Sequence, residues 1–426
     1  MKLLAYTANH PSRKNLRVRY IEAVAKSLSE KYPVKIIWIV CQPKPIPSEE
    51  STDYSIHDIH EFSNSVDLLK KLKPDFVMVS VGIELIQYSL GISAKYLQIP
   101  LISFLSAKMI FQTLPSSNRV QQSFRRMISS NVSTDISDEG ENFKRLRFFF
   151  YKLNFLFKTK LSIKMNPLKI ISQTLKELPA QTGLRPLTPN VISNLYIAHH
   201  ENQKSNIIKK SIPSEKIIVT GHPLLDIMHE KYKKQQINSK NISHPKILIV
   251  TDSLFEHGLW TSQQRDNFLT NLFSVLIEHD IDFSLKIHPA SENKIYYEKL
   301  LRQLNTNSKI FQSEDLWDVI SDYNMILSYG YSTSQTEISY AGMRMIMLFP
   351  GIELPKFPLV ADGISSGHIQ ECKQIDDLPN QIEKLFKKEI KLSDDFIQAR
   401  NKLFFKFDGK SAERIANAII NLLYSK

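Results

Sequence analysis

Short runs of mostly apolar residues recur along this chain, and segments with helical spacing separate them. Examples are Val34–Val40, Asp75–Val81, Lys246–Thr251 and Arg344–Phe349. Continuous apolar runs of this length are typical of strands that are buried on both faces of a parallel sheet. Because strand and helix alternate with short turns between them, the sequence predicts an α/β protein built from Rossmann-like domains.

Two stretches interrupt this alternation and indicate the domain organisation. Residues 108–189 are more basic and more aromatic than the rest, and residues 231–245 are polar. We therefore expect an N-terminal domain over residues 1–230 with the insertion at about 108–189, and a linker over residues 231–245. A C-terminal domain follows over residues 246–390. A helical segment over residues 391–426 ends the chain, and its last helix can pack back on the first domain.

Composition places the chain among ordinary globular proteins. It has 426 residues, of which 42% are hydrophobic and 23% are charged, and a chain of this length can form two or three cores. Cys41 and Cys372 show neither a disulfide framework nor metal-site spacing, which favours a reducing compartment. The chain begins as a strand rather than a signal peptide, and no window predicts a transmembrane helix. We expect a cytoplasmic protein.

The net charge of +12 is concentrated in the insertion. Between Arg119 and Arg185 there are thirteen Lys/Arg residues and five Asp/Glu residues. Such a patch suits an anionic glycan acceptor or the inner face of a membrane, and no nucleic-acid-binding motif accompanies it. Phe143–Leu161 mixes aromatic residues with lysines, which predicts a basic helix in peripheral contact with the membrane. The alternative is a helix packed inside the domain.

His288–Pro289 is the first candidate functional motif. It follows the strand-like run Phe283–Ile287, and the carboxyl ends of strands are where open α/β sheets bind ligands. The chain has three other His-Pro pairs, at His10, His222 and His244. Each of the four can be a loop residue that precedes a proline, so the context of His288 carries the interpretation.

Two Rossmann-like domains joined by a polar linker describe the GT-B architecture, in which two domains face a cleft. Three motifs then resemble the bacterial sialyltransferases, in particular the polysialyltransferase-like family. They are Asp138-Glu139-Gly140 in the first domain, and His288-Pro289 and Ser332-Thr333 in the second. The motifs occur in the expected order, and the resemblance covers nearly the whole chain. It implies that the first domain binds the acceptor and that the second binds the nucleotide-sugar donor.

The resemblance implies an inverting transfer of sialic acid from CMP-sialic acid to a glycan in capsule or lipopolysaccharide synthesis. Glu139 would be the general base that deprotonates the acceptor, with Asp138 as the second candidate. His288 would donate to the phosphate of the leaving CMP, next to Pro289. Hydroxyls at the start of the following helix would hold the same phosphate. These hydroxyls belong to Ser332, Thr333 and Ser334, and their alternative role is simple N-capping.

Two more residues are candidates for donor binding. GT-B enzymes often place a carboxylate against the nucleotide ribose, which favours Glu337, although a first-turn Glu also stabilises the helix dipole. His257 lies after the first strand of the second domain, where cytidine or phosphate contacts can form. No Asp-X-Asp motif follows a strand, so we expect neither a metal nor another cofactor.

Several alternatives remain open on the residues alone. A CMP-Kdo or CDP-glycerol type transferase keeps the fold and changes the donor. A nucleotide-sugar 2-epimerase is a further alternative, because Val219–Asp226 and Thr336–Glu337 resemble that group. Epimerases need several carboxylates and have no need of the basic insertion. A non-catalytic polyanion-binding or membrane-binding protein would explain the basic residues alone, and His10 is a rival for the role of general base.

Overall fold

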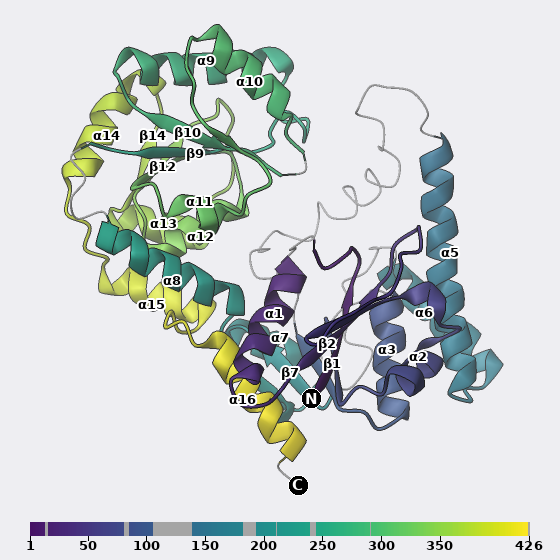
Figure 1. The fold of residues 1–426 in the computed structure, drawn as a ribbon. Helices are drawn as coiled ribbons and strands as arrows, with labels where there is room; N and C mark the ends of the chain where they lie inside the picture. Colours follow the sequence, from purple (N-terminus) through teal and green to yellow (C-terminus); the bar gives the residue numbers. More distant parts are fainter. Residues whose placement is uncertain are drawn as a thin grey trace. The chain divides into compact units, whose positions relative to one another are not determined.

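The computed structural model describes residues 1–12, 16–80, 85–104, 139–181, 193–209, 211–238, 244–289 and 291–424. The chain forms two compact units (Figure 1). Unit 1 contains Met1–Leu224 together with Lys410–Lys426, and unit 2 contains Leu225–Gly409. Each unit is a Rossmann-like α/β domain built on a sheet of mainly parallel strands, so the predicted fold class is confirmed.

Unit 1 has an eight-stranded sheet among its described residues, in the order β3-β4-β2-β1-β5-β6-β7-β8. Every neighbouring pair is parallel except β3 with β4. The strands are β1 (Lys2–Thr7), β2 (Lys35–Val40), β3 (Glu49–Glu50), β4 (Tyr54–Asp58), β5 (Phe76–Ser80), β6 (Leu101–Phe104), β7 (Leu195–Ala198) and β8 (Ile217–Val219). The apolar runs Val34–Val40 and Asp75–Val81 thus become the interior strands β2 and β5, which pair with β1 on either side of it.

Helices cover both faces of this sheet. They are α1 (Leu16–Ser29), α2 (Ser65–Leu72), α3 (Leu85–Tyr96), α5 (Glu139–Ser162), α6 (Pro167–Gln181), α7 (Glu201–Ile208) and α16 (Ser411–Tyr424). Successive strand residues point to opposite faces, so Leu3 packs with α1 and α16 while Leu4 packs with α2 and α3. The last helix therefore completes the core of the first unit, as the sequence indicates.

Unit 2 has a six-stranded sheet among its described residues, in the order β11-β10-β9-β12-β13-β14, and every ladder is parallel. Its strands are β9 (Ile247–Val250), β10 (Phe283–Lys286), β11 (Ile310–Phe311), β12 (Met325–Tyr329), β13 (Met345–Leu348) and β14 (Ile369–Cys372). Its helices are α8 (Pro223–Asn238), which begins two residues before the unit, α9 (Ser262–Glu278), α10 (Lys294–Gln303), α11 (Leu316–Ile320), α12 (Thr333–Ala341), α13 (Pro358–Ser366), α14 (Leu378–Lys387) and α15 (Asp394–Phe404).

The chain order of these strands creates a switch point. From β9 the chain moves outward on one side through β10 and β11, and β12 then starts on the other side of β9. The loops after β9 and β12 therefore diverge, and the carboxyl edge between them is where sheets of this kind bind ligands. Helix α8 runs through the first part of the segment predicted to be a linker, residues 231–245. The predicted domain boundaries themselves stay predictions.

Candidate functional site

The strongest cluster of polar side chains in unit 2 lies at the carboxyl edge of its sheet. It combines the loop after β9, the loop after β10 and the first turn of α12, which follows β12. Strand β9 is the middle one of the three. Of the predicted residues, the structure brings His288, Pro289, Ser332 and His257 to this edge, because each follows one of these strands.

Strand β10 ends at Lys286, and His288 follows it with only Ile287 between them. The His288 side chain is exposed. The backbone N–H of Ser291 donates to the imidazole Nδ1 at 3.2 Å, and the Ser291 Oγ lies 2.7 Å from the same nitrogen. Because Nδ1 accepts from a backbone N–H, the ring proton of the neutral imidazole must reside on Nε2. Partial burial lowers the pKa of His288, which favours this neutral form at physiological pH. Nε2 is therefore the nitrogen from which the neutral ring donates a hydrogen bond.

Glu292 stabilises the loop after β10 through hydrogen bonds. It was not among the residues predicted from the sequence. Its side chain is buried, and its carboxylate accepts hydrogen bonds from the Thr251 hydroxyl and the Tyr297 hydroxyl. It also accepts from the backbone N–H of His288 at 2.5 Å. One carboxylate thus ties together the end of β9, the end of β10 and helix α10. The available sequence signal was an acidic residue a few positions after His288-Pro289.

Asp252, the first loop residue after Thr251 at the end of β9, joins this loop to the β12 side. Its Oδ2 accepts from the backbone N–H of Tyr331 at 2.6 Å, and its Oδ1 accepts from Ser253 N–H at 2.9 Å. Burial raises the pKa of Asp252, and these two backbone donors oppose the rise. Ser253 Oγ in turn lies 2.6 Å from Ser291 Oγ, so the β9 and β10 loops are also connected. A position directly after a buried strand was the signal for Asp252.

Ser332 is the N-cap of α12, and its hydroxyl accepts from the backbone N–H of Ser334 at 3.4 Å. The two hydroxyls lie 2.7 Å apart. N-capping was the alternative reading of these serines, and the geometry shows that Ser332 fills that role. Thr333 begins the helix, and its side chain lies outside the described residues. The first turn of α12 still directs backbone N–H groups towards the carboxyl edge, as anion-binding helices do.

Glu337 lies one turn into α12 and is half-buried. Its Oε2 accepts a hydrogen bond from the indole Nε1 of Trp317, which belongs to α11, at 2.9 Å. Burial raises the pKa of the Glu337 carboxyl to about 7, and the Trp317 hydrogen bond opposes that rise. Helix α12 has no acidic residue in its first turn, so the alternative role of Glu337, a first-turn Glu that favours the helix dipole, does not apply.

His257 occupies the turn after β9, where its backbone N–H donates to the Ser253 carbonyl at 2.9 Å, and its side chain is exposed. Asp138 lies outside the described residues. Glu139 begins α5, and its side chain also lies outside them. His10, the rival base, has both ring nitrogens engaged, with Ser12 Oγ at 2.8 Å and Glu49 Oε1 at 3.1 Å.

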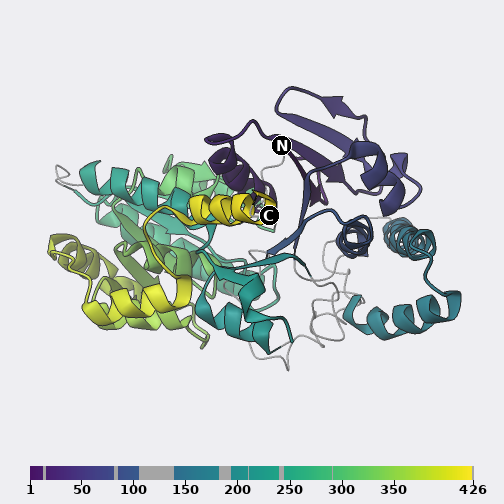
Figure 2. The same cartoon turned by 90° about the horizontal axis from the view of Figure 1, so that it is seen from below.

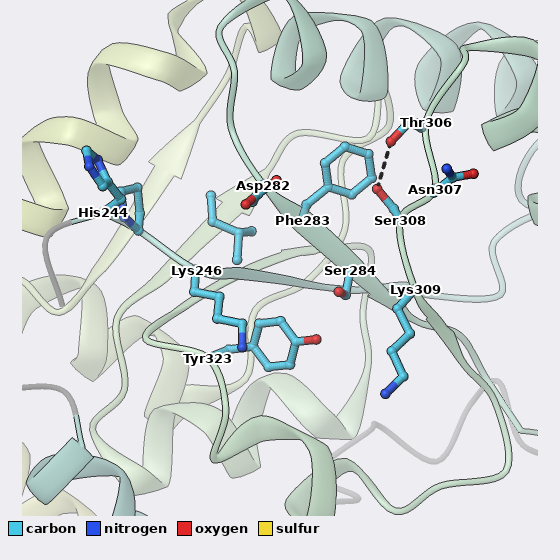
Figure 3. A pocket seen from close by; sticks show the side chains of 12 residues that line it. His244, Lys246, Asp282, Phe283, Ser284, Thr306, Asn307, Ser308, Lys309 and Tyr323 are labelled. Atoms are coloured by element: carbon cyan, nitrogen blue, oxygen red, sulfur yellow. Dashed lines mark hydrogen bonds between the residues drawn. The ribbon is translucent and has the colours of Figure 1, made fainter.

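A pocket of about 770 Å³ lies at the other edge of the same sheet (Figure 3). Residues at the amino ends of β9, β10 and β11 line it, among them Lys246, Ser284, Lys309 and Tyr323. It contains none of the predicted site residues, and the nearby pair His244–Pro245 is the only one of the four His-Pro pairs that lines it. Among the described residues no group of three or more His, Cys, Asp and Glu side chains has the geometry of a metal site. The expectation of a reaction without metal stays a prediction.

Comparison with known proteins gives a likeness in structure but not in sequence. No family model matches the chain, and no curated protein is similar to it in sequence. The UDP-GlcNAc 2-epimerase of Methanocaldococcus jannaschii matches with a TM-score of 0.53 at 16% identity, over 98% of this chain and 99% of that chain. A Listeria monocytogenes protein assigned as a UDP-N-acetylglucosamine 2-epimerase matches with a TM-score of 0.52 at 13% identity, over 100% and 97%. A third UDP-N-acetylglucosamine 2-epimerase matches with a TM-score of 0.50 at 14% identity, over 100% and 96%. At such identities the likeness establishes the shared two-domain, GT-B-like fold.

These comparisons correct the functional prediction from the sequence. The resemblance to bacterial sialyltransferases is wrong, because the three solved structures named above, which share this fold over the full chain, are UDP-GlcNAc 2-epimerases and not sialyltransferases. The predicted enzyme class is therefore wrong as well. It was a CMP-sialic acid-dependent glycosyltransferase acting in capsule or lipopolysaccharide synthesis. The physical reason lies in the motifs. Ser332 caps a helix and His288 ends a strand, and both roles belong to Rossmann-like domains in general, so these short motifs do not identify a donor.

Proposed function

We propose that this protein is a nucleotide-sugar 2-epimerase whose second unit holds the nucleotide diphosphate. The observation that carries the proposal is the set of hydrogen bonds that connects the loops after β9, β10 and β12 at the switch point. Asp252 links the first to the third, and Ser253 links the first to the second. The likeness of the whole chain to UDP-GlcNAc 2-epimerases supports the choice of reaction.

The chemistry of C2 inversion explains why such an enzyme needs a diphosphate site. The C2 proton of a hexose is not adjacent to a carbonyl group, so its removal alone would leave an unstabilised carbanion. If the C1–O bond to the diphosphate breaks as the C2 proton leaves, the electron pair forms a C1=C2 double bond. Return of a proton to the opposite face of C2, with renewed attack of the phosphate oxygen on C1, yields the 2-epimer. The net change is isomerisation without an oxidant.

Unit 2 would stabilise the diphosphate while it is detached from the sugar. The neutral His288 imidazole would donate from Nε2 to a phosphate oxygen, and the backbone N–H groups at the start of α12 would donate to another. Pro289, Ser334 and the Thr333 hydroxyl remain proposed contacts around them, and His257 a proposed contact to the nucleotide. Glu337, in its ionised form, would accept hydrogen bonds from the ribose.

The groups that move the proton at C2 are a separate part of the proposal. Inversion needs a base on one face of the sugar and an acid on the other. Glu139 and Asp138 stay the proposed pair for these roles, with His10 as the alternative base. The replacements Glu139→Gln and Asp138→Asn would abolish epimerisation and leave UDP binding to unit 2 unchanged if this assignment holds.

We also propose that the protein works in the cytoplasm, in peripheral contact with the membrane. Cys41 and Cys372 are both buried and form no disulfide, as suits a reducing compartment. Among the described residues no helix is long and apolar enough to cross a membrane. The membrane contact would instead come from the basic helices of unit 1.

The test is an incubation with UDP-N-acetylglucosamine in deuterated water, followed by proton NMR. The expected result is appearance of the 2-epimer, with deuterium at C2 of both sugars. UDP-N-acetylglucosamine that stays unchanged and keeps its C2 proton, under conditions in which UDP binds the protein, would exclude the reaction for this substrate. UDP-glucose and CMP-linked sugars serve as comparison substrates.

Two histidines of unit 2 provide a matched pair of variants. His288→Ala removes the proposed phosphate donor and should lower kcat/KM about 100-fold or more, as loss of a charge-stabilising donor does in other enzymes. His244→Ala alters a second His-Pro pair at the opposite edge of the sheet and should change kcat/KM little. Equal activity of the two variants would contradict the proposed role of His288.

A further inference from the structure

Helix α5 presents two apolar faces, and unit 1 covers one of them. Phe155 and Leu156 are buried, and Phe155 belongs to the core that α2 and α3 form on the sheet. Thr159 Oγ1 accepts from the Ser65 backbone N–H at 3.1 Å, which fixes α5 against α2. Figure 1 shows α2 and α3 between the sheet and α5. The helix is therefore an integral part of the unit, and its orientation is set.

The outward side of α5 and α6 carries large apolar side chains that the protein leaves exposed. Phe150, Phe157 and Leu161 follow the spacing of one helix stripe, and Leu168 and Ile171 follow it on the adjoining helix α6. Between 38% and 77% of the surface of these five side chains is exposed. Single exposed apolar residues are common, but several large ones on two adjoining helices favour a binding surface. Figure 2 shows the two helices at the periphery of unit 1.

Positive charge surrounds this stripe. From Arg147 to Thr174 the sequence contains six Lys/Arg residues and no Asp or Glu. One of the six, Lys160, is buried, and its Nζ lies 3.3 Å from the Thr174 hydroxyl. Arg147, Lys158, Lys164 and Lys169 are exposed. Their aliphatic stems can lie along an apolar surface while the charged ends reach anionic groups.

We propose that the α5–α6 surface, defined as the exposed face of Arg147–Ile171, binds the headgroup region of an anionic lipid bilayer. Apolar side chains with flanking lysines and no acidic residues match such an interface in both respects. A second copy of the chain fits less well. Symmetric pairing through this face would bring the lysines of one copy against those of the other. The inference concerns location and does not depend on the reaction that unit 2 supports.

Flotation of the full-length protein with lipid vesicles tests the proposal. One set of vesicles contains phosphatidylcholine alone, and the other contains phosphatidylcholine mixed with phosphatidylglycerol. Binding is expected to the mixed vesicles only, and it should weaken as salt is added. Binding to neither set, or equal binding to both, would overturn the proposal.

Two double variants separate the contributions of charge and apolar contact. Lys158→Glu with Lys169→Glu should lower partitioning at least about 30-fold, because each lysine near an anionic surface contributes about fivefold. Phe157→Ser with Leu168→Ser should lower it at least about tenfold through lost apolar burial. Because all four side chains are exposed, the melting temperature of both double variants should stay close to that of the wild type.

Matched control variants lie in unit 2. Ile295 on α10 is 70% exposed, so Ile295→Ser changes an apolar side chain as accessible as Leu168. Lys384→Glu with Lys391→Glu applies the same change of charge far along the sequence from α5. These controls should bind vesicles like the wild type, and if they lose binding equally the contact is not specific to the α5–α6 surface. A dimer in light scattering that Phe157→Ser with Leu168→Ser abolishes, without vesicle binding, would assign the surface to self-association instead.

Discussion

The carboxylate of Glu292 accepts a hydrogen bond from the backbone N–H of His288 at 2.5 Å. This contact fixes the peptide that carries the imidazole rather than the imidazole itself. The ring is held separately, through Ser291. Backbone and side chain of His288 are thus positioned by different partners, and their effects can be measured separately.

Replacing Glu292 by Ala should destabilise the protein by about 2–4 kcal/mol. The Thr251 and Tyr297 hydroxyls and the His288 N–H would all lose this shared acceptor in a buried environment, and such a loss is costly. Glu292→Gln keeps one carbonyl acceptor and should cost less. Urea unfolding measures both effects. Glu298→Gln on the same helix is the control, because Glu298 makes only surface ion pairs with Lys294 and Arg302 at 3.9 and 4.0 Å. Equal loss in the Glu298 and Glu292 variants would contradict the role of the buried network.

Gly330 and Gly258 form a second matched pair at the same edge of the sheet. Both have positive φ, +83° and +71°, so an Ala at either position carries backbone strain of about 1 kcal/mol. Only at Gly330 would the added Cβ meet another atom, because the Asp252 Oδ2 would lie 2.2 Å from it. Gly330→Ala should therefore also break the hydrogen bond that the Tyr331 N–H donates to Asp252. It should lower the free energy of unfolding by at least about 2 kcal/mol more than Gly258→Ala does. Thermal and urea unfolding of the two variants give the difference; similar values would show that the loop yields without strain.

The sequence predicts most of the architecture because buried parallel strands leave a local signal. The run Lys246–Thr251 becomes β9, Ile247–Val250, and the run Arg344–Phe349 becomes β13, Met345–Leu348, each within one residue of the predicted bounds. Some strands near the sheet edges were not predicted. Tyr54–Asp58 forms β4, for which the sequence predicted no strand, because only alternate residues of it are apolar. Helix α8 was not predicted over its second half, because that half is almost entirely polar.

The site could be predicted only where it depends on position along a strand. His288 and Ser332 were found because each follows a recognisable strand. Glu292 was not found, because a buried carboxylate is defined by its partners Thr251 and Tyr297, which lie on other elements. The donor was predicted wrongly for a related reason. Motifs of two or three residues report a turn, and the specificity for a nucleotide sugar resides in side chains brought together by the fold.

The buried histidines of unit 1 predict how stability depends on pH. His222 is 1% exposed, its Nδ1 accepts from Leu224 N–H at 3.2 Å, and burial lowers its pKa to about 3. The neighbouring His199 ring lies 4.3 Å away between centroids, and burial also lowers its pKa. The unfolded chain therefore binds more protons, so stability is complete above about pH 6.5 and falls as the pH drops below it.

His222 alone should account for about 2 kcal/mol of stability lost between neutral pH and about pH 5. His222→Asn keeps an acceptor for the Leu224 N–H and cannot be protonated, so its stability should depend less steeply on pH. Urea unfolding across this pH range measures the slope. A variant with the slope of the wild type would assign the acid sensitivity to other buried histidines, such as His200 and His368, whose pKa values burial lowers to about 4.

Glu337 predicts the opposite dependence in unit 2. Its folded pKa of about 7 lies above the ordinary value of 4.5, so the folded state binds the extra proton. The stability that this carboxyl contributes is complete below about pH 4.5 and is lost as the pH rises through about 7. Between about pH 5 and pH 8 the loss should be on the order of 2 kcal/mol. Glu337→Gln, which stays neutral and still accepts from Trp317, should be more stable than the wild type at pH 8 and similar to it at pH 5.

Trp317→Phe tests the cause of this shift. The indole Nε1 donates to Glu337 and favours the ionised form, so its removal should raise the pKa of Glu337 further and move the loss of stability to higher pH. The midpoint of the pH profile, rather than the overall stability, is the relevant measurement, because the smaller ring also leaves a cavity. An unchanged midpoint in Trp317→Phe would mean that another group sets the protonation of Glu337. It would also remove the reason to expect an ionised ribose acceptor at this position near neutral pH.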